Sequence, residues 1–132
     1  MGSRSRQKGK RGEREAAAEL GSLLGCTSRR GVQYQGGPES PDVVLDGVAI
    51  HVEAKRVEAL NLYAALEQAT NDAPQGSVPI VWHRRNNKPS VVIVETRNLV
   101  ALARIVHDAA TAIEAGQDDA GRASATGPSG DC

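Results

Sequence analysis

Apolar residues recur at helical spacing in three stretches of the chain. Over about 12–24, alanines and leucines fall on one helical face, and Gly25 stands where that helix would end. Residues 61–72 carry a second such face, and the Ala-Pro-Gln-Gly breaker at 73–76 follows it. A third runs over 99–113, and Thr96 is suited to cap its helix. The pattern therefore predicts three amphipathic helices.

Short apolar runs between these stretches predict strands. Residues 42–45 and 49–56 flank Asp46-Gly47, a dipeptide suited to the positive-φ positions of a tight hairpin. Residues 78–83 alternate too little to face water on one side, which favours a central strand. The other strand candidates are 31–35 and 91–95. The order of elements predicts an α/β fold in which helices flank a mixed five-stranded sheet.

The composition sets limits on the function. A chain of 132 residues has room for one domain, and its aromatic residues, one Trp and two Tyr, offer no platform for stacking single-stranded bases. The net charge is +0, but basic residues dominate 1–14 and acidic residues dominate 107–132. We expect a flexible basic arm over 1–10, a folded domain over 11–115 and a disordered tail over 116–132.

The cysteines and the hydropathy indicate the compartment. Cys26 and Cys132 are two lone thiols without a CxxC motif, so neither a disulfide framework nor a zinc site is predicted. There is no apolar run near the roughly 20 residues that cross a bilayer. The basic N-terminus is not followed by the apolar segment of a signal peptide. These features predict a cytoplasmic protein without a membrane partner.

Three acidic residues and one lysine converge in the predicted fold. Alternation along the second strand of the hairpin places Glu53 and Lys55 on one face, and the turn brings Asp42 beside Glu53. Counting back along the first helix places Glu13 on its inward face, where an unpaired carboxylate is costly. Such a group suits Mg²⁺ or Mn²⁺ and phosphodiester hydrolysis, because the metal lowers the pKa of a bound water.

Each of these residues also has a plainer interpretation. Glu53 and Lys55 can form an exposed pair on a solvated sheet face. Glu13 can be an acid of the first helical turn, where it interacts with the helix dipole. Asp42 can simply start a strand, and His51, on the same face as Glu53, is expected to support the site or to face DNA rather than to be a ligand. The four side chains of the group taken together favour catalysis.

Two motifs resemble those of known nucleases. Pro41-Asp42 followed by Glu53-Ala54-Lys55 has the pattern of the PD-(D/E)xK nucleases. The segment Lys8-Gly9-x-x-x-Glu13-Arg14 resembles the opening motif of archaeal-type and phage Holliday junction resolvases. The resemblance covers about 8–105 and implies a restriction-endonuclease-like core; the Gly-Gly-Pro-Glu-Ser stretch at 36–40 and the acidic tail depart from it.

The resemblance also implies the roles of single residues. It implies a divalent metal, Mg²⁺ with Mn²⁺ as a substitute, held by Asp42, Glu53, the Ala54 carbonyl and Glu13 as a further acidic member. Lys55 becomes the catalytic lysine, and Gln68 matches a polar position near the site. The implied protein is a homodimer that acts on branched DNA in the cytoplasm, of a bacterial host if it is phage-encoded.

The expected function is a metal-dependent endodeoxyribonuclease similar to Holliday junction resolvases. One alternative is a nicking enzyme or a structure-specific nuclease for flaps or forks. Another is a catalytically silent DNA-binding module of the same fold, which would keep the basic arm without the acids. The basic residues expected to contact DNA phosphates are Lys8, Lys10, Arg11, Arg29, Arg30, Arg84 and Arg85.

Overall fold

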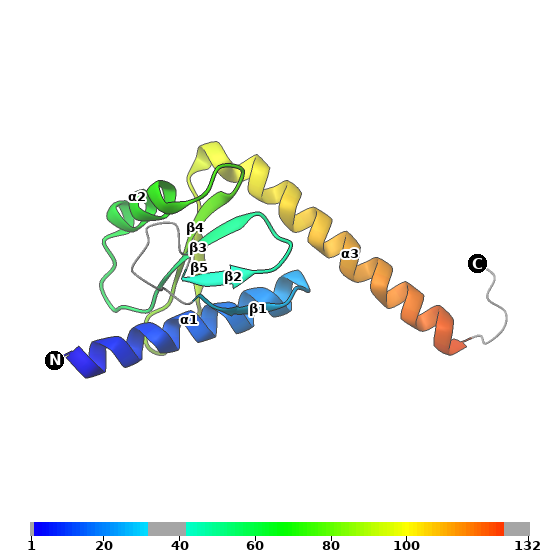
Figure 1. The fold of residues 1–132 in the computed structure, drawn as a ribbon, viewed down its shortest axis with the longest axis horizontal. Coiled ribbons are helices and arrows are strands. Elements are labelled where there is room, and N and C mark those ends of the chain that lie inside the picture. Colours follow the sequence, from blue (N-terminus) through cyan, green and yellow to red (C-terminus); the bar gives the residue numbers. More distant parts are fainter. Residues whose placement is uncertain (1, 32–41, 126–132) are drawn as a thin grey trace.

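A five-stranded mixed sheet forms the centre of the protein (Figure 1). The computed structural model describes the backbone of residues 2–31 and 42–125, and the side chains of 9–31 and 42–116. In spatial order, the strands are β1 (Ser28–Arg30), β2 (Val43–Leu45), β3 (Ile50–Lys55), β4 (Val78–His83) and β5 (Val91–Ile93). Only the β3–β4 pair is parallel among these neighbours. The predicted α/β class and mixed five-stranded sheet are confirmed.

Two helices cover opposite faces of this sheet (Figure 1). Helix α1 (Gly2–Leu24) packs its Ala and Leu stripe on the face that contains Ile80, and α2 (Leu62–Asp72) packs on the face that contains Val81. Successive residues of a strand point to opposite faces, so β4 supplies side chains to both layers. Five of its six residues are buried, which confirms that it is not an edge strand.

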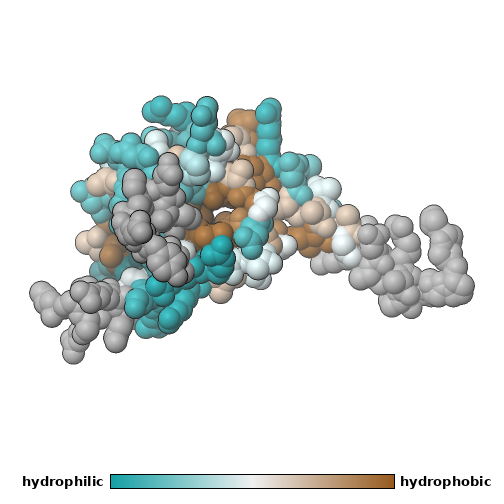
Figure 2. Space-filling model, in the orientation of Figure 1, coloured by the Kyte–Doolittle hydropathy of each residue, from teal (hydrophilic) through white to brown (hydrophobic). Residues whose placement is uncertain are grey.

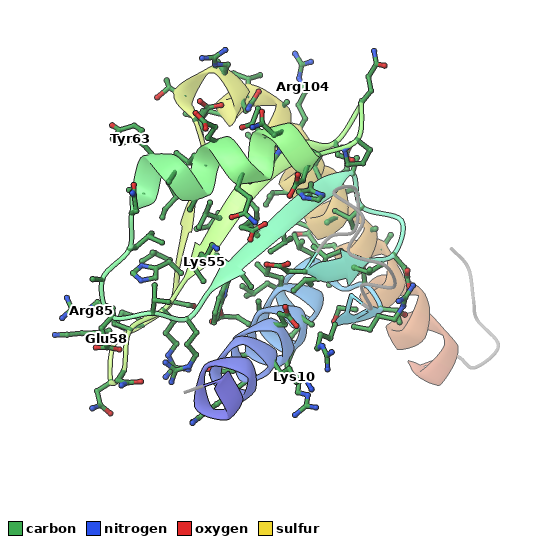
Figure 3. The ribbon with its side chains drawn as sticks, turned by 60° about the vertical axis from the view of Figure 1, so that its left-hand side comes forward. Lys10, Lys55, Glu58, Tyr63, Arg85 and Arg104 are labelled. Carbon is green, nitrogen blue, oxygen red and sulfur yellow. The ribbon has the colours of Figure 1, made fainter. Side chains whose placement is uncertain are left out.

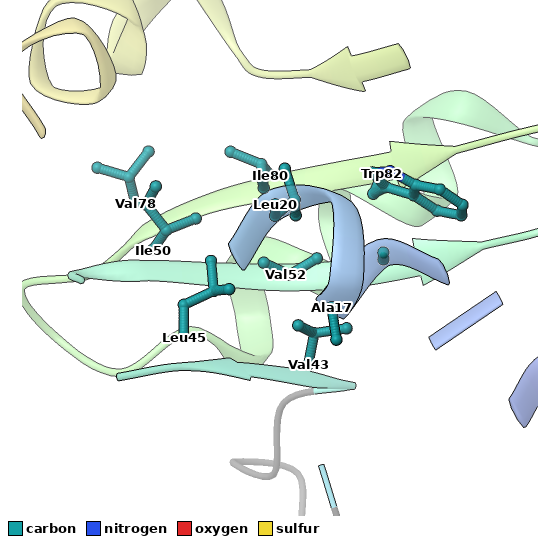
Figure 4. Packing of buried hydrophobic residues seen from close by; sticks show 10 residues of the cluster. Ala17, Leu20, Val43, Leu45, Ile50, Val52, Val78, Ile80 and Trp82 are labelled. Carbon is teal, nitrogen blue, oxygen red and sulfur yellow. The ribbon is translucent and has the colours of Figure 1, made fainter. Parts of the chain in front are cut away.

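The larger core lies between α1 and the sheet (Figure 4). Leu20 of α1 packs there with Val52, Ile80 and Trp82, whose exposed fractions are 0%, 2% and 1%. Trp82 also donates a hydrogen bond from Nε1 to Glu19 Oε1 at 2.8 Å. The core is thus built from aliphatic side chains and one tryptophan, and its polar indole nitrogen is satisfied by α1.

The helices extend further than the apolar pattern predicts. Helix α1 begins at Gly2, within the stretch predicted to be a flexible arm, and α3 (Leu99–Ala125) continues into the stretch predicted to be a disordered tail. These extensions contain Arg, Lys, Gln and Ala, which favour helix, together with Gly, Ser and Asp, and they carry no apolar face. Periodicity therefore located the packed part of each helix and missed its ends.

Two local predictions differ from the structure. Thr96 does not cap α3; it begins the short 3₁₀ helix η1 (Thr96–Asn98), whose N-cap is Glu95, and α3 follows directly. The first strand is β1, which ends at Arg30, whereas the predicted strand at 31–35 lies outside the described residues apart from Gly31. Gly25 ends α1 with a φ of 64°, as predicted.

Candidate active site

The β2–β3 hairpin brings two carboxyl groups into contact. Val43 pairs with Val52, so the next pair outward along the antiparallel ladder is Asp42 and Glu53. Their side chains share a hydrogen bond, and Asp42 Oδ2 also accepts one from the Ala54 backbone N–H at 3.0 Å. The Asp46-Gly47 turn, with Gly47 at a φ of 75°, sets this register. The predicted juxtaposition of the two acids is present.

Burial changes the acidity of Glu53. The residue is only 4% exposed, which rules out an exposed pair on a solvated face. Burial raises the pKa of Glu53 from 4.5 to about 8, with a further contribution from the charge of Asp42, whereas Lys55 opposes the rise. Two carboxylates in contact cannot easily both ionise. Near neutral pH the pair therefore holds a proton unless a cation replaces it.

Lys55 lies beside this pair and under α2 (Figure 3). Its Nζ lies 3.5 Å from Glu53 Oε2 and donates a hydrogen bond to Gln68 Oε1 at 3.3 Å. Gln68 lies on α2, the helix that connects the parallel strands β3 and β4. The structure thus places Lys55 and Gln68 together beside Glu53. The Lys55 ammonium group lies between the Glu53 carboxyl group and the Gln68 side-chain amide.

Glu13 approaches the pair from α1. Its Oε1 lies 3.0 Å from Arg30 Nε on β1. Burial raises the pKa of Glu13, and the charge of Asp42 adds to this effect, while Arg30 opposes it. Because α1 begins at Gly2, Glu13 is not in the first turn, so its interpretation as a helix-dipole acid is wrong. Glu13 contributes negative charge near Asp42 and is partly neutralised by Arg30.

The oxygen donors of this site fit a small divalent cation. Across the described ranges, no three or more His, Cys, Asp or Glu side chains are grouped to hold a metal ion. The donors that do meet are the carboxylates of Asp42 and Glu53, with Ala54 next in the chain able to offer its carbonyl oxygen. Mg²⁺ is typically bound through one or two carboxylates and keeps several waters. The set is compatible with this mode, without Glu13 as a direct ligand.

A partly buried ion cluster links α1 to the end of β3. Arg56, 8% exposed, donates from Nε to Glu15 Oε1 at 2.5 Å and from Nη1 to Asn86 Oδ1 at 3.0 Å. Glu15 Oε2 accepts a further hydrogen bond from Arg84 Nη1 at 2.6 Å. Neither Glu15 nor Arg56 stands out in the sequence. A usable signal was the position of Arg56 directly after the buried strand, where a buried guanidinium needs a carboxylate.

Gly12 allows α1 to approach this cluster. The residue is buried, and a Cβ added to it would lie 2.8 Å from Arg56 Cβ. Real side chains do not approach so closely, so any residue larger than glycine would push α1 away from β3. Glu13 is the next residue, and its position near Asp42 therefore depends on this close contact.

The basic residues predicted to contact DNA fall into two groups. Lys10 and Arg29 are exposed and make no ion pair within the described residues, whereas Arg11 is exposed and lies 3.6 Å from Glu15. Those that pair with acids are Arg30 with Glu13, Arg84 with Glu15 and Arg85 with Glu58 at 3.9 Å. Figure 3 shows Lys10 on α1 and Arg85 at the β4–β5 turn. The side chain of Lys8 lies outside the described side chains. Arg84 is thus engaged in the structure, Arg11 is exposed beside Glu15, and Lys10 and Arg29 are freer to meet phosphates.

His51 lies on the same face of β3 as Glu53. It is 3% exposed, and burial lowers its pKa, so the imidazole is neutral near pH 7. Its Nε2 makes no hydrogen bond to the residues that the structure describes. The charges of Asp72 and Asp42 act on it from two sides. This environment agrees with the expected supporting position beside the acids.

The raised pKa of Glu53 predicts how stability varies with pH. Between pH 4.5 and about 8 the folded protein holds a proton that the unfolded chain releases. The contribution of Glu53 to the stability of the metal-free protein is therefore fully present below pH 4.5. This contribution is lost as the pH rises through about 8. We expect thermal melts in EDTA to show a decreasing Tm over this range, with a flatter profile for Glu53→Gln. An equally steep profile in the variant would contradict the assignment.

Comparison of the chain with family models, with curated proteins and with solved structures returned no match. Within 2–31 and 42–125, none of the helices combines the length and the apolar character that a membrane crossing requires.

Proposed function

We propose that this protein is a metal-dependent endodeoxyribonuclease with a restriction-endonuclease-like core, which hydrolyses phosphodiester bonds in branched DNA as Holliday junction resolvases do. The observation that carries the proposal is the contact between the half-buried Asp42 and the buried Glu53, with Lys55 Nζ 3.5 Å from Glu53. Ordinary surface charges give no reason to bury one acid against another, because the desolvation cost of the buried carboxylate is large. A nuclease site gives such a reason, because the two carboxylates would bind its metal cation.

The residues divide the chemistry between them. Asp42, Glu53 and the Ala54 carbonyl would hold Mg²⁺ or Mn²⁺, which supplies positive charge to the phosphate and acidifies a bound water. Lys55 orients the attacking water or offsets charge that develops on the phosphate, and Gln68 holds its ammonium group in place. Glu13, balanced by Arg30, adds an acidic group at the edge of the site.

DNA would approach along the exposed basic residues. Lys10 and Arg11 on α1 and Arg29 on β1 are exposed on the two elements that also carry Glu13 and its partner Arg30. Phosphate contacts of this kind position a duplex without reading its sequence. Recognition of a branch by shape suits such a surface, and two symmetric incisions in a four-way junction suit a homodimer.

The test is incubation of the purified protein with a labelled four-way junction and with a linear duplex of matched sequence. Each substrate is treated with Mg²⁺ or with EDTA, and the products are separated by denaturing electrophoresis. We expect paired cuts in the junction with Mg²⁺ and intact DNA in EDTA. Equal cutting of the linear duplex would instead favour a nicking enzyme. Tight binding without cleavage in Mg²⁺ and in Mn²⁺ would favour a silent DNA-binding module.

A further inference from the structure

A cavity of about 230 Å³ adjoins the candidate active site. It lies between the first two turns of α2 and the segment that leads from β3 to this helix. Figure 3 shows Lys55 in the space between β3 and α2. Lys55 and Gln68 line the cavity and also form the hydrogen bond beside Glu53. A molecule in the cavity would therefore lie next to the lysine that is proposed to act on the scissile phosphate.

The lining combines apolar walls with hydrogen-bond donors. Its aliphatic side chains are those of Val57, Ala59, Leu60, Ala64 and Ala65. The polar side chains are engaged through their oxygens, because Gln68 Oε1 accepts from Lys55 and Asn61 Oδ1 accepts from the Ala64 N–H. The atoms left for a ligand are therefore chiefly N–H donors. Among the described residues that line the cavity, none is acidic. This lining fits a ligand with apolar faces and acceptor atoms on its edge.

A nucleobase has these properties. Its faces are apolar, its edge carries acceptors, and in DNA it is joined through its sugar to the phosphate that Lys55 would contact. A cavity of this size accommodates one base and not a base pair, so the base must be unpaired. A larger hollow between α3 and the sheet (Figure 2) is lined, within the described part of the chain, by aliphatic side chains alone. Those side chains offer no such donors.

We propose that the cavity beside Lys55 holds one unpaired base of the DNA strand that is cut, next to the scissile phosphate. The inference rests on the proposed nuclease function and gives a physical reason for a preference for branched DNA. Extruding a base costs pairing and stacking energy, and this cost is least for a base that is already unpaired. The duplex is interrupted at a branch point, so a base there is released more readily than one inside a linear duplex.

The first test uses 2-aminopurine, a base whose fluorescence rises when it leaves the stack. It is placed in turn at each position beside the branch point of a four-way junction, and the full chain is added in EDTA. We expect a several-fold rise at one position. Ala64→Leu should abolish the rise, because Ala64 is an exposed residue of the lining and the longer side chain fills part of the cavity. Ala101→Leu, at an exposed position of α3, is the matched control and should behave as the wild type does.

An abasic nucleotide at the responding position separates base entry from a general loss of affinity. With the normal base, Ala64→Leu should bind the junction about tenfold more weakly than the wild type, and with the abasic nucleotide the two should bind equally. Equal weakening on both junctions, or binding by the wild type without a fluorescence rise at any position, would overturn the proposal. A rise that Ala64→Leu removes, in a protein that does not cleave with Mg²⁺, would support base binding and contradict the nuclease function. Failure of the wild type to bind the junction would overturn both.

Discussion

Asp42→Asn is expected to reduce DNA cleavage by about a thousandfold or more, because it removes charge from the carboxylate pair that would hold the metal. The amide keeps an oxygen that can accept the hydrogen bond from the Ala54 N–H, so the hairpin should remain folded. Binding to a four-way junction should persist, since no basic residue changes. Cleavage is measured under single-turnover conditions with Mg²⁺, and binding by gel shift.

The matched control is Asp46→Asn, four residues away in the hairpin turn. Asp46 is exposed and lies outside the acidic pair, so its variant should cleave like the wild type. Asp42→Asn should also lower the pKa of Glu53 and thereby flatten the decrease of Tm with pH. Cleavage by Asp42→Asn at the wild-type rate would contradict the assignment of Asp42 to the active site.

Gly12→Ala is expected to lower cleavage by about ten- to a hundredfold although it touches neither substrate nor metal. The new methyl group would lie 2.8 Å from Arg56 Cβ, which is not the mobile end of a side chain. Helix α1 must then move away from β3, and Glu13 moves with it; displacements near 1 Å can cost a hundredfold in rate. Over-packing should also reduce stability by about 1–3 kcal/mol.

Gly9→Ala separates this effect from that of helix propensity. Gly9 lies on the same helix, but a Cβ there meets no atom of the described structure within 4 Å. The substitution should therefore leave cleavage unchanged and stabilise the helix slightly. Equal cleavage by the two variants would show that the close contact between α1 and Arg56 does not position the site.

The hairpin and the position of its acids could be predicted because residues close together in the sequence determine them. Asp46-Gly47 fixes the turn, the turn fixes the register, and the register places Asp42 opposite Glu53. Alternation then puts Lys55 on the same face. Each step depends on neighbouring residues in the sequence. Strands β2 to β5 followed for the same reason, since they are short apolar runs between clear turn signals, whereas the polar β1 (Ser28–Arg30) carries no such run.

The remaining features depend on residues that are far apart in the sequence. Glu15 looks like any helix-surface acid until the fold places it between Arg56 and Arg84. The pairing of Glu13 with Arg30 likewise depends on the packing of α1 against β1. The ends of α1 and α3 were missed because polar helical turns carry no apolar period, although their residues favour helix.

Some contacts of the site connect residues that are close in the sequence, and others connect residues that are far apart. This difference affects the order in which the site forms during folding. The Asp42–Ala54 and Lys55–Gln68 hydrogen bonds span 12 and 13 residues, whereas the Glu15 bonds to Arg56 and Arg84 span 41 and 69. Closing a longer loop costs more chain entropy, so contacts between near neighbours tend to form first. The β2–α2 segment would then assemble the acids and the lysine early. Docking of α1, which brings Glu13, would complete the centre late in folding.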